Sequence, residues 1–178
     1  MISIRTERPA DVAAREALLD VAYGPVRFTK PSQRLREHRD PALSFVALEQ
    51  GRVVGTVRLW PVVAGAGRPA LLLGPLAVHP DCRRRGIGAA LMRRALGAAG
   101  EAGHAAVLLV GDASYYGRFG FTAAKTGALA MPGSEPERLL ALELVPGALD
   151  GAQGLVRVGT PRRAPRRAVA APAVAHAA

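Results

Sequence analysis

Cysteine is nearly missing from this chain of 178 residues. With Cys82 as the sole cysteine, an internal disulfide and a thiolate metal cluster are both excluded, and a reducing, cytoplasmic compartment is expected. The histidines His38, His79, His104 and His176 are scattered along the chain without the spacing of metal ligands. The sequence therefore predicts a protein without a bound metal.

Aromatic residues and long apolar runs are also scarce. Aromatics make up 4% of the chain, so a core has to be built from Leu, Val, Ala and Ile. The longest apolar runs fall well short of the about 18 residues that suggest a membrane-spanning helix. The first residues have acids close behind them, unlike a secretory signal. The length fits a single domain, for which no membrane partner is expected.

The formal net charge of +10 raises the question of nucleic acid or an anionic membrane as a partner. The sequence beyond Leu155 has five arginines and no acid, so it contributes +5 and the body carries 10 − 5 = +5. This segment has no interleaved aromatics to stack on bases, and we expect no nucleic-acid partner. Its Pro, Ala and Arg content predicts a disordered tail over residues 159–178, which leaves residues 1–158 as the domain. The tail arginines are Arg157, Arg162, Arg163, Arg166 and Arg167.

Hydrophobic periodicity predicts strands interspersed with helices. Helices are expected from Pro9 to about residue 22, over about 32–39 in a charged segment, over about 86–102, and from Asp112 through Tyr116. Gln50-Gly51 is a good hairpin turn between the second and third strands. Strands are expected over residues 2–5, 43–49, 52–60, 70–78, 105–110 and 138–145, the last of which is the final clear one, and another begins over 121–124.

Two further segments have distinctive local features. Pro75 cannot donate to a strand ladder, and with Gly74 beside it we expect a bulge or a splayed edge there. The loop over residues 23–30 carries polar and aromatic groups that suit the lining of a substrate cleft, although a plain surface connection explains it equally well.

The segment over residues 78–89 stands between a buried strand and a helix. A helix start presents unpaired amides and a partial positive charge, which can hold a pyrophosphate. Gly86 and Gly88 leave room for such a group, and Arg83, Arg84 and Arg85 add cationic donors. Taken alone, the arginine run is equally well explained as a solvated helix end. The full glycine pattern of dinucleotide sites and its acidic partner are missing, which disfavours that class.

This segment resembles the acetyl-CoA motif of the GNAT superfamily of N-acetyltransferases, Arg/Gln-x-x-Gly-x-Gly/Ala, filled here by residues 83–88 and preceded by Leu-Ala-Val-His-Pro over 76–80. A second marker, Tyr-x-x-x-Gly-Phe, is matched by Tyr116, Gly120 and Phe121. The wider run over residues 109–121 is similar to a bacterial subgroup, the YhbS-like proteins. The resemblance covers roughly residues 2–150.

The resemblance implies a fold and a reaction. The fold would be α+β, with a mixed, mostly antiparallel twisted sheet of six to seven strands, about four helices and splayed central strands. The chain would transfer acetyl from acetyl-CoA to a primary amine of a small molecule or protein. Tyr116 would be the general acid for the leaving thiolate, and the Val78 amide would face the thioester oxygen. The implied acetyl-CoA-binding residues are Leu76, Ala77 and Val78 for the pantetheine and Arg83, Arg84, Arg85, Gly86, Ile87, Gly88 and Ala89 around the pyrophosphate.

Several questions stay open at the level of sequence. Glu37, Glu49 and Asp112 are candidates for the general base, and none stands out, since Asp112 is equally well explained as a helix cap. Tyr116 alternatively packs in the core, and His79 is expected only to end its strand. Without an obvious base, a non-catalytic acyl-CoA sensor on the same fold remains an alternative. The acceptor and the oligomeric state, a homodimer included, stay undetermined.

Overall fold

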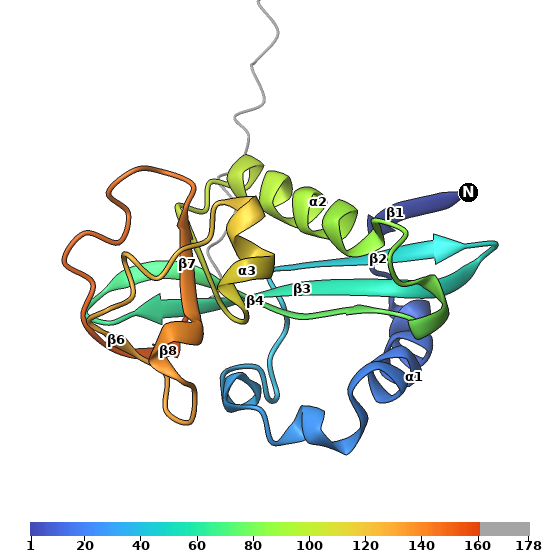
Figure 1. Ribbon diagram of the computed structural model, residues 1–178, viewed down its shortest axis with the longest axis horizontal. Coiled ribbons are helices and arrows are strands. Elements are labelled where there is room, and N and C mark those ends of the chain that lie inside the picture. Colours follow the sequence, from blue (N-terminus) through green and yellow to red (C-terminus); the bar gives the residue numbers. More distant parts are fainter. Residues whose placement is uncertain (161–178) are drawn as a thin grey trace, which may run out of the picture.

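The computed structural model describes residues 1–160, so most of the predicted tail lies outside the described residues. Eight strands form one sheet in the order β1-β2-β3-β4-β5-β7, with β8 pairing β3 and β6 (Figure 1). All pairings are antiparallel except β4 with β5 and β6 with β8. The strands are β1 Ile2–Thr6, β2 Leu43–Glu49, β3 Arg52–Ala64, β4 Arg68–Val78, β5 Ala106–Val110, β6 Leu129–Ala130, β7 Leu139–Glu143 and β8 Gly154–Val158.

The α-helices of the described chain are α1 Val12–Tyr23, α2 Ile87–Glu101 and the short α3 Ala113–Tyr116. Short 3-10 helices fill the connections, the first of which, Pro9–Asp11, leads directly into α1. The turn between β2 and β3 is the predicted hairpin, in which Gln50 and Gly51 both take positive φ angles of 48° and 80°. This geometry matches a two-residue hairpin turn, whose twist suits the paired strands.

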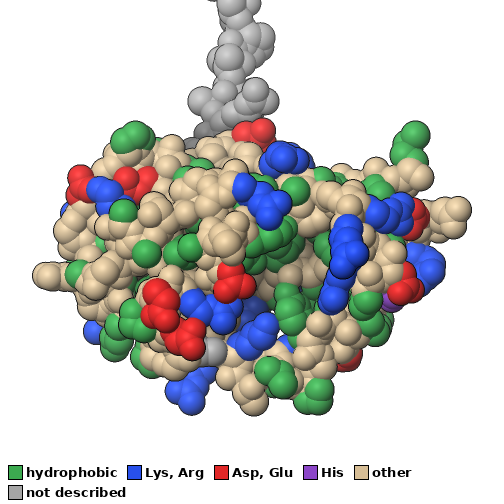
Figure 2. Space-filling model, viewed as in Figure 1, with side chains coloured by type: hydrophobic (Ala, Val, Ile, Leu, Met, Phe, Trp, Pro, Cys, Tyr) green, Lys and Arg blue, Asp and Glu red, His purple; other side chains and the backbone are tan. Residues whose placement is uncertain are grey.

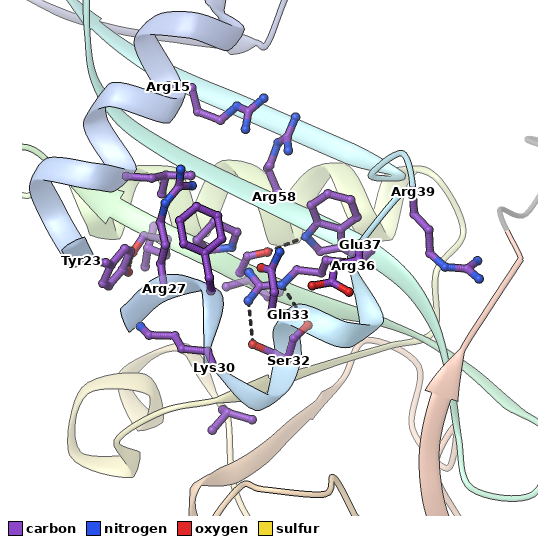
Figure 3. A pocket seen from close by; sticks show the side chains of 18 of the residues that line it. Arg15, Tyr23, Arg27, Lys30, Ser32, Gln33, Arg36, Glu37, Arg39 and Arg58 are labelled. Atoms are coloured by element: carbon purple, nitrogen blue, oxygen red, sulfur yellow. Dashed lines mark hydrogen bonds between the residues drawn. The ribbon is translucent and has the colours of Figure 1, made fainter. Parts of the chain in front are cut away.

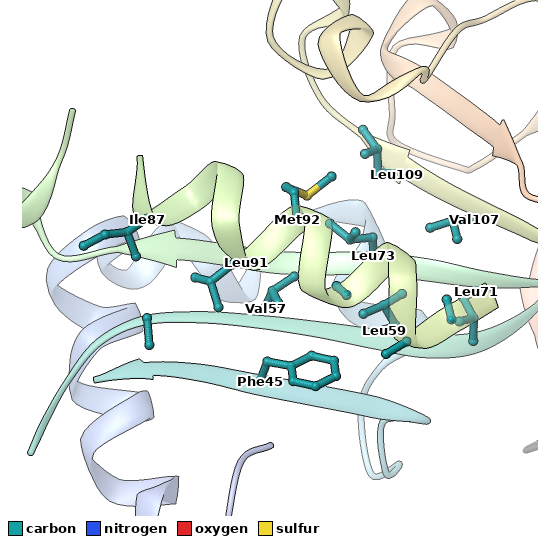
Figure 4. Close-up of a cluster of buried hydrophobic side chains, with 14 of the residues drawn as sticks. Phe45, Val57, Leu59, Leu71, Leu73, Ile87, Leu91, Met92, Val107 and Leu109 are labelled. Carbon is teal, nitrogen blue, oxygen red and sulfur yellow. The ribbon is translucent and has the colours of Figure 1, made fainter. Parts of the chain in front are cut away.

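Helices α1 and α2 cover opposite faces of the sheet (Figure 1). The face of α2 that is fully buried, through Leu91, Met92 and Ala95, packs on side chains from β2, β3, β4 and β5 (Figure 4). Gly55 on β3 permits this close approach, because a Cβ there would lie 2.9 Å from Leu91 Cδ1. Burying a leucine side chain in this way contributes roughly 2 kcal/mol to stability. Helix α2 is therefore held firmly against the sheet. The arginine and glycine motif stands at the start of this helix.

A second core cluster lies on the other face of the sheet and includes Trp60, Leu72, Leu108, Leu149 and Val156. Val156 belongs to β8, which pairs with the end of β3. The sequence analysis placed the final clear strand at residues 138–145 and therefore missed β8. The alternation of apolar and polar residues over Gly154–Val158 is short. The segment is a strand because it pairs with β3 and with β6.

Two predicted elements are wrong. The charged helix over residues 32–39 is a 3-10 helix at Pro31–Leu35 followed by turns, because the Arg36 side chain bonds to Ser32 in place of an extended helical ladder. The strand beginning at 121–124 is a single bridge between Thr122 and Ala141, since the Thr122 hydroxyl accepts from the Ala124 amide and turns the chain. The observed fold otherwise confirms the α+β class, the mostly antiparallel sheet and the splayed centre.

Candidate active site

The centre of the sheet opens between β4 and β5. These two strands pair in parallel only at Leu71 with Val107 and at Leu72 with Leu108, and β4 then continues to Val78 without β5. A cis Gly74-Pro75 peptide and a shift in the β3–β4 register between Val57 and Leu59 mark the divergence. This is the irregularity that Pro75 predicted. The last residues of β4 therefore have no β5 partner along one edge of the strand.

The backbone of Val78 faces this unpaired edge. The next amide, that of His79, donates to Val54 of β3 at 2.9 Å. Successive backbone amides of a strand point to opposite sides, so the Val78 amide points away from β3. Ala77 is buried against the core, whereas the Leu76 carbonyl on the open side accepts a hydrogen bond from the Tyr23 hydroxyl of α1. The strand end therefore offers polar backbone groups to the gap, one of which Tyr23 already engages.

The head of α2 lies directly beyond this strand. Gly86 is the residue before the first helical turn and has a φ of 75°, a left-handed conformation that favours glycine. No atom lies within 4 Å of the place a Cβ would take at Gly86. The first helical amides, those of Ile87 to Ala89, precede the first intrahelical bond, which the Ala90 amide donates to the Gly86 carbonyl at 3.0 Å. This combination of open space and unpaired amides fits a phosphate group, as the sequence predicted.

The three motif arginines are not equivalent. Arg85 is held in a bidentate pair with Glu49 at 2.6 and 3.0 Å, so its charge is already neutralised by the protein. Arg83 and Arg84 are exposed, and within residues 1–160 neither forms an ion pair. The structure thus leaves two of the three guanidinium groups available beside the helix head. Sequence reasoning missed the Glu49 pairing, because its partners are far apart along the chain.

Gly88 and Ala89 lie in the first turn of α2, where both are partly buried, and Ile87 is anchored in the core. Across the gap, the Tyr115 hydroxyl approaches to 3.1 Å from the place a Cβ at Gly88 would take. The position of Tyr115 links α3 to the helix head, which only the packing of two distant segments reveals.

Tyr116 stands on α3 at the side of the gap formed by β5. Its ring packs edge-on against Tyr115 and Phe121, with ring centroids 4.9 and 6.2 Å apart. Burial raises the pKa of its hydroxyl well above the usual range, and Tyr23, Tyr115 and Asp112 raise it further. Tyr116 thus carries its proton throughout the ordinary pH range. It packs on the core cluster and also lines a cavity.

The cavity has a volume of about 450 Å³ and lies between α1, the 3-10 segments after it, and the diverging part of β4. In the space-filling view, Lys and Arg side chains gather around the central hollow of this face (Figure 2). We call this cavity between α1, the 3-10 segments and β4 the basic cavity. Its floor includes Trp60, whose indole donates to the Gly74 carbonyl at 2.6 Å, and its wall includes Tyr116. The basic side chains that line it are Arg15, Arg27, Lys30, Arg36, Arg39 and Arg58 (Figure 3).

The structure separates the three candidate bases. Glu37 lines the basic cavity together with Tyr116. Glu49 lies on the outer side of β2 with Arg85 and Cys82, and its pKa is lowered chiefly by the Arg85 hydrogen bond. Asp112 is exposed, stands before α3 without a side-chain capping bond, and lies 3.6 Å from Arg138. Glu37 alone of the three therefore shares a cavity with Tyr116.

Other classes of site find no support in residues 1–160. No group of three or more His, Cys, Asp or Glu side chains stands close enough to hold a metal ion. His79 ends β4 and lies 3.6 Å from Asp81, as expected for a residue that closes its strand. None of the helices described has both the length and the apolar character to cross a membrane.

The fold, the opened sheet and the glycine-headed helix define an N-acetyltransferase of the GNAT class, and comparison with known proteins agrees. The acetyltransferase (GNAT) domain family matches residues 40–123. Over 157 residues the chain is 35% identical to the uncharacterized N-acetyltransferase YhbS of Escherichia coli. The aligned residues cover 86% of this chain and 93% of that protein. The chain belongs to the GNAT family and is an N-acetyltransferase of enzyme class 2.3.1.

Two solved structures share this fold at similar identity. The crystal structure of Escherichia coli YhbS in complex with CoA has a TM-score of 0.76 and 34% identity, covering 88% of this chain and 89% of that one. A GNAT acetyltransferase from Brucella melitensis in complex with acetyl-CoA has a TM-score of 0.70 and 32% identity, covering 90% and 97%. The resemblance drawn from the two motifs is thus confirmed.

Proposed function

We propose that this chain transfers an acetyl group from acetyl-CoA to a primary amine by direct attack of the amine on the thioester. One observation carries the proposal. The Val78 amide and the head of α2 lie on one side of the gap between β4 and β5, Tyr116 lies on the other, and the basic cavity meets Tyr116. The CoA and acetyl-CoA complexes of the two similar structures support the same donor here.

The donor would be held by the groups that the protein leaves unpaired. The α2 amides from Ile87 to Ala89, with Arg83 and Arg84, would bind the pyrophosphate. The open edge of β4 at Leu76 to Val78 would pair with the pantetheine amides, as an added strand would. Arg85 would act indirectly, because its pair with Glu49 fixes the approach to Gly86.

The groups around the thioester divide the chemistry between them. The amine nitrogen bonds to the thioester carbon, and the oxygen that becomes negative is stabilised by the Val78 amide. As the carbon–sulfur bond breaks, the sulfur accepts a hydrogen bond from the Tyr116 hydroxyl. Because the pKa of Tyr116 is raised, its proton is held, and donating a hydrogen bond to a thiolate of pKa about 8.5 suits it better than full transfer.

The amine must lose a proton before or during its attack, since a lysine-like amine has a pKa of about 10.4. Glu37 is the candidate base that lines the basic cavity, so we assign it the acceptance of this proton, directly or through a water. Its exposed position leaves a path for the proton to reach solvent. The attacking nitrogen loses its second proton as the intermediate collapses, and the CoA thiolate takes up one proton, so the products are the amide, the CoA thiol and one released proton.

A panel of amines tests the proposal by release of the CoA thiol. Tyr116→Phe is expected to lower kcat by at least about tenfold with little change in acetyl-CoA affinity, since it removes an interaction made to the leaving group. Glu37→Gln is expected to lower kcat most at low pH, where an amine needs a base most. Glu135→Gln, an exposed change outside the cavity, serves as the control. Tight acetyl-CoA binding without thiol release for any amine would favour the sensor alternative.

A further inference from the structure

Arg36 is a buried cation for which the described residues supply no carboxylate. Its side chain has a relative exposure of 8%, and its Nε and Nη2 atoms donate to the carbonyl and the hydroxyl of Ser32 at 3.0 and 2.7 Å. Both partners are neutral. Burial lowers the pKa of the guanidinium to about 10, which shows how little its surroundings compensate the charge.

The third nitrogen of this group is directed at the bend of β4. Nη1 lies 3.8 Å from the place a Cβ at Gly74 would take, and no hydrogen bond from it is formed within residues 1–160. Arg36 therefore presents a donor to the basic cavity beside the point where β4 leaves β5 (Figure 3). It stands on the same cavity as Tyr116.

Most other cations of the basic cavity are neutralised by the protein itself. Arg15 and Arg58 share the carboxylate of Glu7, at 3.1 and 2.9 Å. Arg27 pairs with Glu16 at 2.6 Å and with Asp20 at 2.9 Å. With the further pair of Arg15 and Glu16, three arginines of the cavity wall are matched by three carboxylates.

Lys30 and the exposed Arg39 join Arg36 as lining cations that form no ion pair within residues 1–160. The Lys30 ammonium lies 3.9 Å from the centre of the Tyr23 ring. Burial lowers the pKa of Lys30, and the neighbouring charge of Arg36 lowers it further. Two mutually repelling cations are thus kept next to one enclosed space, and Glu37 is the lining acid that no ion pair engages among the described residues.

An isolated buried charge is costly unless a partner compensates it. We propose that the acceptor is a small amine that also carries an anionic group, a carboxylate or a phosphate, and that Arg36 and Lys30 bind this group. The proposal rests on the acetyl transfer proposed above and adds the class of acceptor. The anion is held at Arg36 beside β4, while the amine reaches towards Glu37 and Tyr116.

The size of the cavity favours a small molecule over a protein chain. Its volume of about 450 Å³ is in the range of small-molecule sites. The phosphates of acetyl-CoA have their own binding groups at the head of α2, next to Arg83 and Arg84. Arg36 should therefore affect the acceptor and not the donor.

Matched amines that differ only in the anion test the proposal. Tyrosine is compared with tyramine for the carboxylate, and O-phosphoethanolamine with ethanolamine for the phosphate. At least one anionic member is expected to have a kcat/KM about tenfold or more above that of its partner without the anion, as one charge-assisted contact allows. Equal or better use of tyramine and ethanolamine would overturn the proposal.

The Arg36→Met variant removes the charge and keeps much of the volume. It is expected to abolish the preference for the anionic member, mainly by raising KM, while Arg36→Lys restores part of it. Acetyl-CoA affinity should stay unchanged in both, which also shows that they are folded. Arg93→Met, an exposed change on α2, should leave the preference intact. A preference that survives Arg36→Met would contradict the assignment.

Equilibrium binding separates this inference from the proposed reaction. Calorimetry with tyrosine and O-phosphoethanolamine, without acetyl-CoA, should show binding that Arg36→Met weakens at least about tenfold. Such binding without any acetyl transfer would support the anion site and refute the reaction. Transfer to tyramine as readily as to tyrosine, with no Arg36-dependent binding, would support the reaction and refute the anion site.

Discussion

The ring of Tyr116 occupies the space that a side chain at Gly111 would need. A Cβ at residue 111 would lie 2.2 Å from Tyr116 Cε2 and 2.7 Å from its Cδ2. Gly111 directly follows β5, so the strand end and the tyrosine ring are in close contact across five residues of chain. The direction of the Tyr116 hydroxyl therefore depends on a glycine outside both family motifs.

Gly111→Ala is accordingly expected to displace the Tyr116 ring and to lower kcat by at least about tenfold, since small misplacement of a reacting group is costly. Acetyl-CoA affinity should change much less. Steady-state kinetics and calorimetry measure the two effects. Gly97→Ala is the matched control, because no atom lies within 4 Å of its added Cβ. Unaltered kcat in Gly111→Ala would show that the ring position does not limit turnover.

Gly86→Glu should abolish acetyl-CoA binding. The change strains a residue with a φ of 75° and brings negative charge to the place assigned to the pyrophosphate. Gly67→Glu is its control, because Gly67 has a similar φ of 83° and open space around it but lies at the other end of β4. Calorimetry should find binding lost only in Gly86→Glu. Undiminished affinity would remove the helix head from the donor site.

Asp11 should make stability depend on pH in the acid range. The Arg5 hydrogen bonds, followed by the Arg8 amide, lower the pKa of its carboxyl from 3.8 to about 2. A lowered pKa contributes stability above pH about 4 that is lost as the pH falls through about 2. Because Arg5 is partly exposed and solvent screens the pair, Asp11→Asn should reduce the free energy of unfolding by about 1 kcal/mol at pH 7 and by far less at pH 2.

Urea denaturation at the two pH values measures this difference. Glu101→Gln, an exposed change at the end of α2, should show no comparable effect. The same loss for Asp11→Asn at both values would mean that packing, and not the charge, makes Asp11 important.

The unligated protein should gain stability when Arg36 loses its charge. The fall of its pKa from 12.5 to about 10 means that burial penalises the charged form at pH 7, by about 3 kcal/mol. This penalty is present below pH 10 and is relieved only as the pH rises towards 12.5. The two hydrogen bonds to Ser32 offset about 2 kcal/mol. Arg36→Met is thus expected to raise the free energy of unfolding by about 1 kcal/mol.

Thermal unfolding checks this expectation, with Arg36→Lys as the variant that keeps a charge. Addition of an anionic amine should raise the Tm of the natural chain and leave that of Arg36→Met unchanged. A strong destabilisation by Arg36→Met would instead assign Arg36 a structural role.

Local sequence patterns were sufficient wherever neighbours along the chain decide the structure. The hairpin at Gln50-Gly51, helix α2 and the break at Gly74-Pro75 depend on positive φ angles, apolar periodicity and a missing amide, all of which are written in adjacent residues. The glycine-headed helix start was predicted for the same reason. These elements are also the ones that carry the family motifs.

The sequence by itself thus determined the fold class, the family and the segment assigned to the acetyl donor. Only the tertiary structure decided which charges are available there and in the basic cavity. Arg85 pairs with Glu49 from a distant part of the chain, and within residues 1–160 no acid forms an ion pair with Arg36. Whether a charge is compensated depends on distance and burial in space, and periodicity along a sequence contains neither.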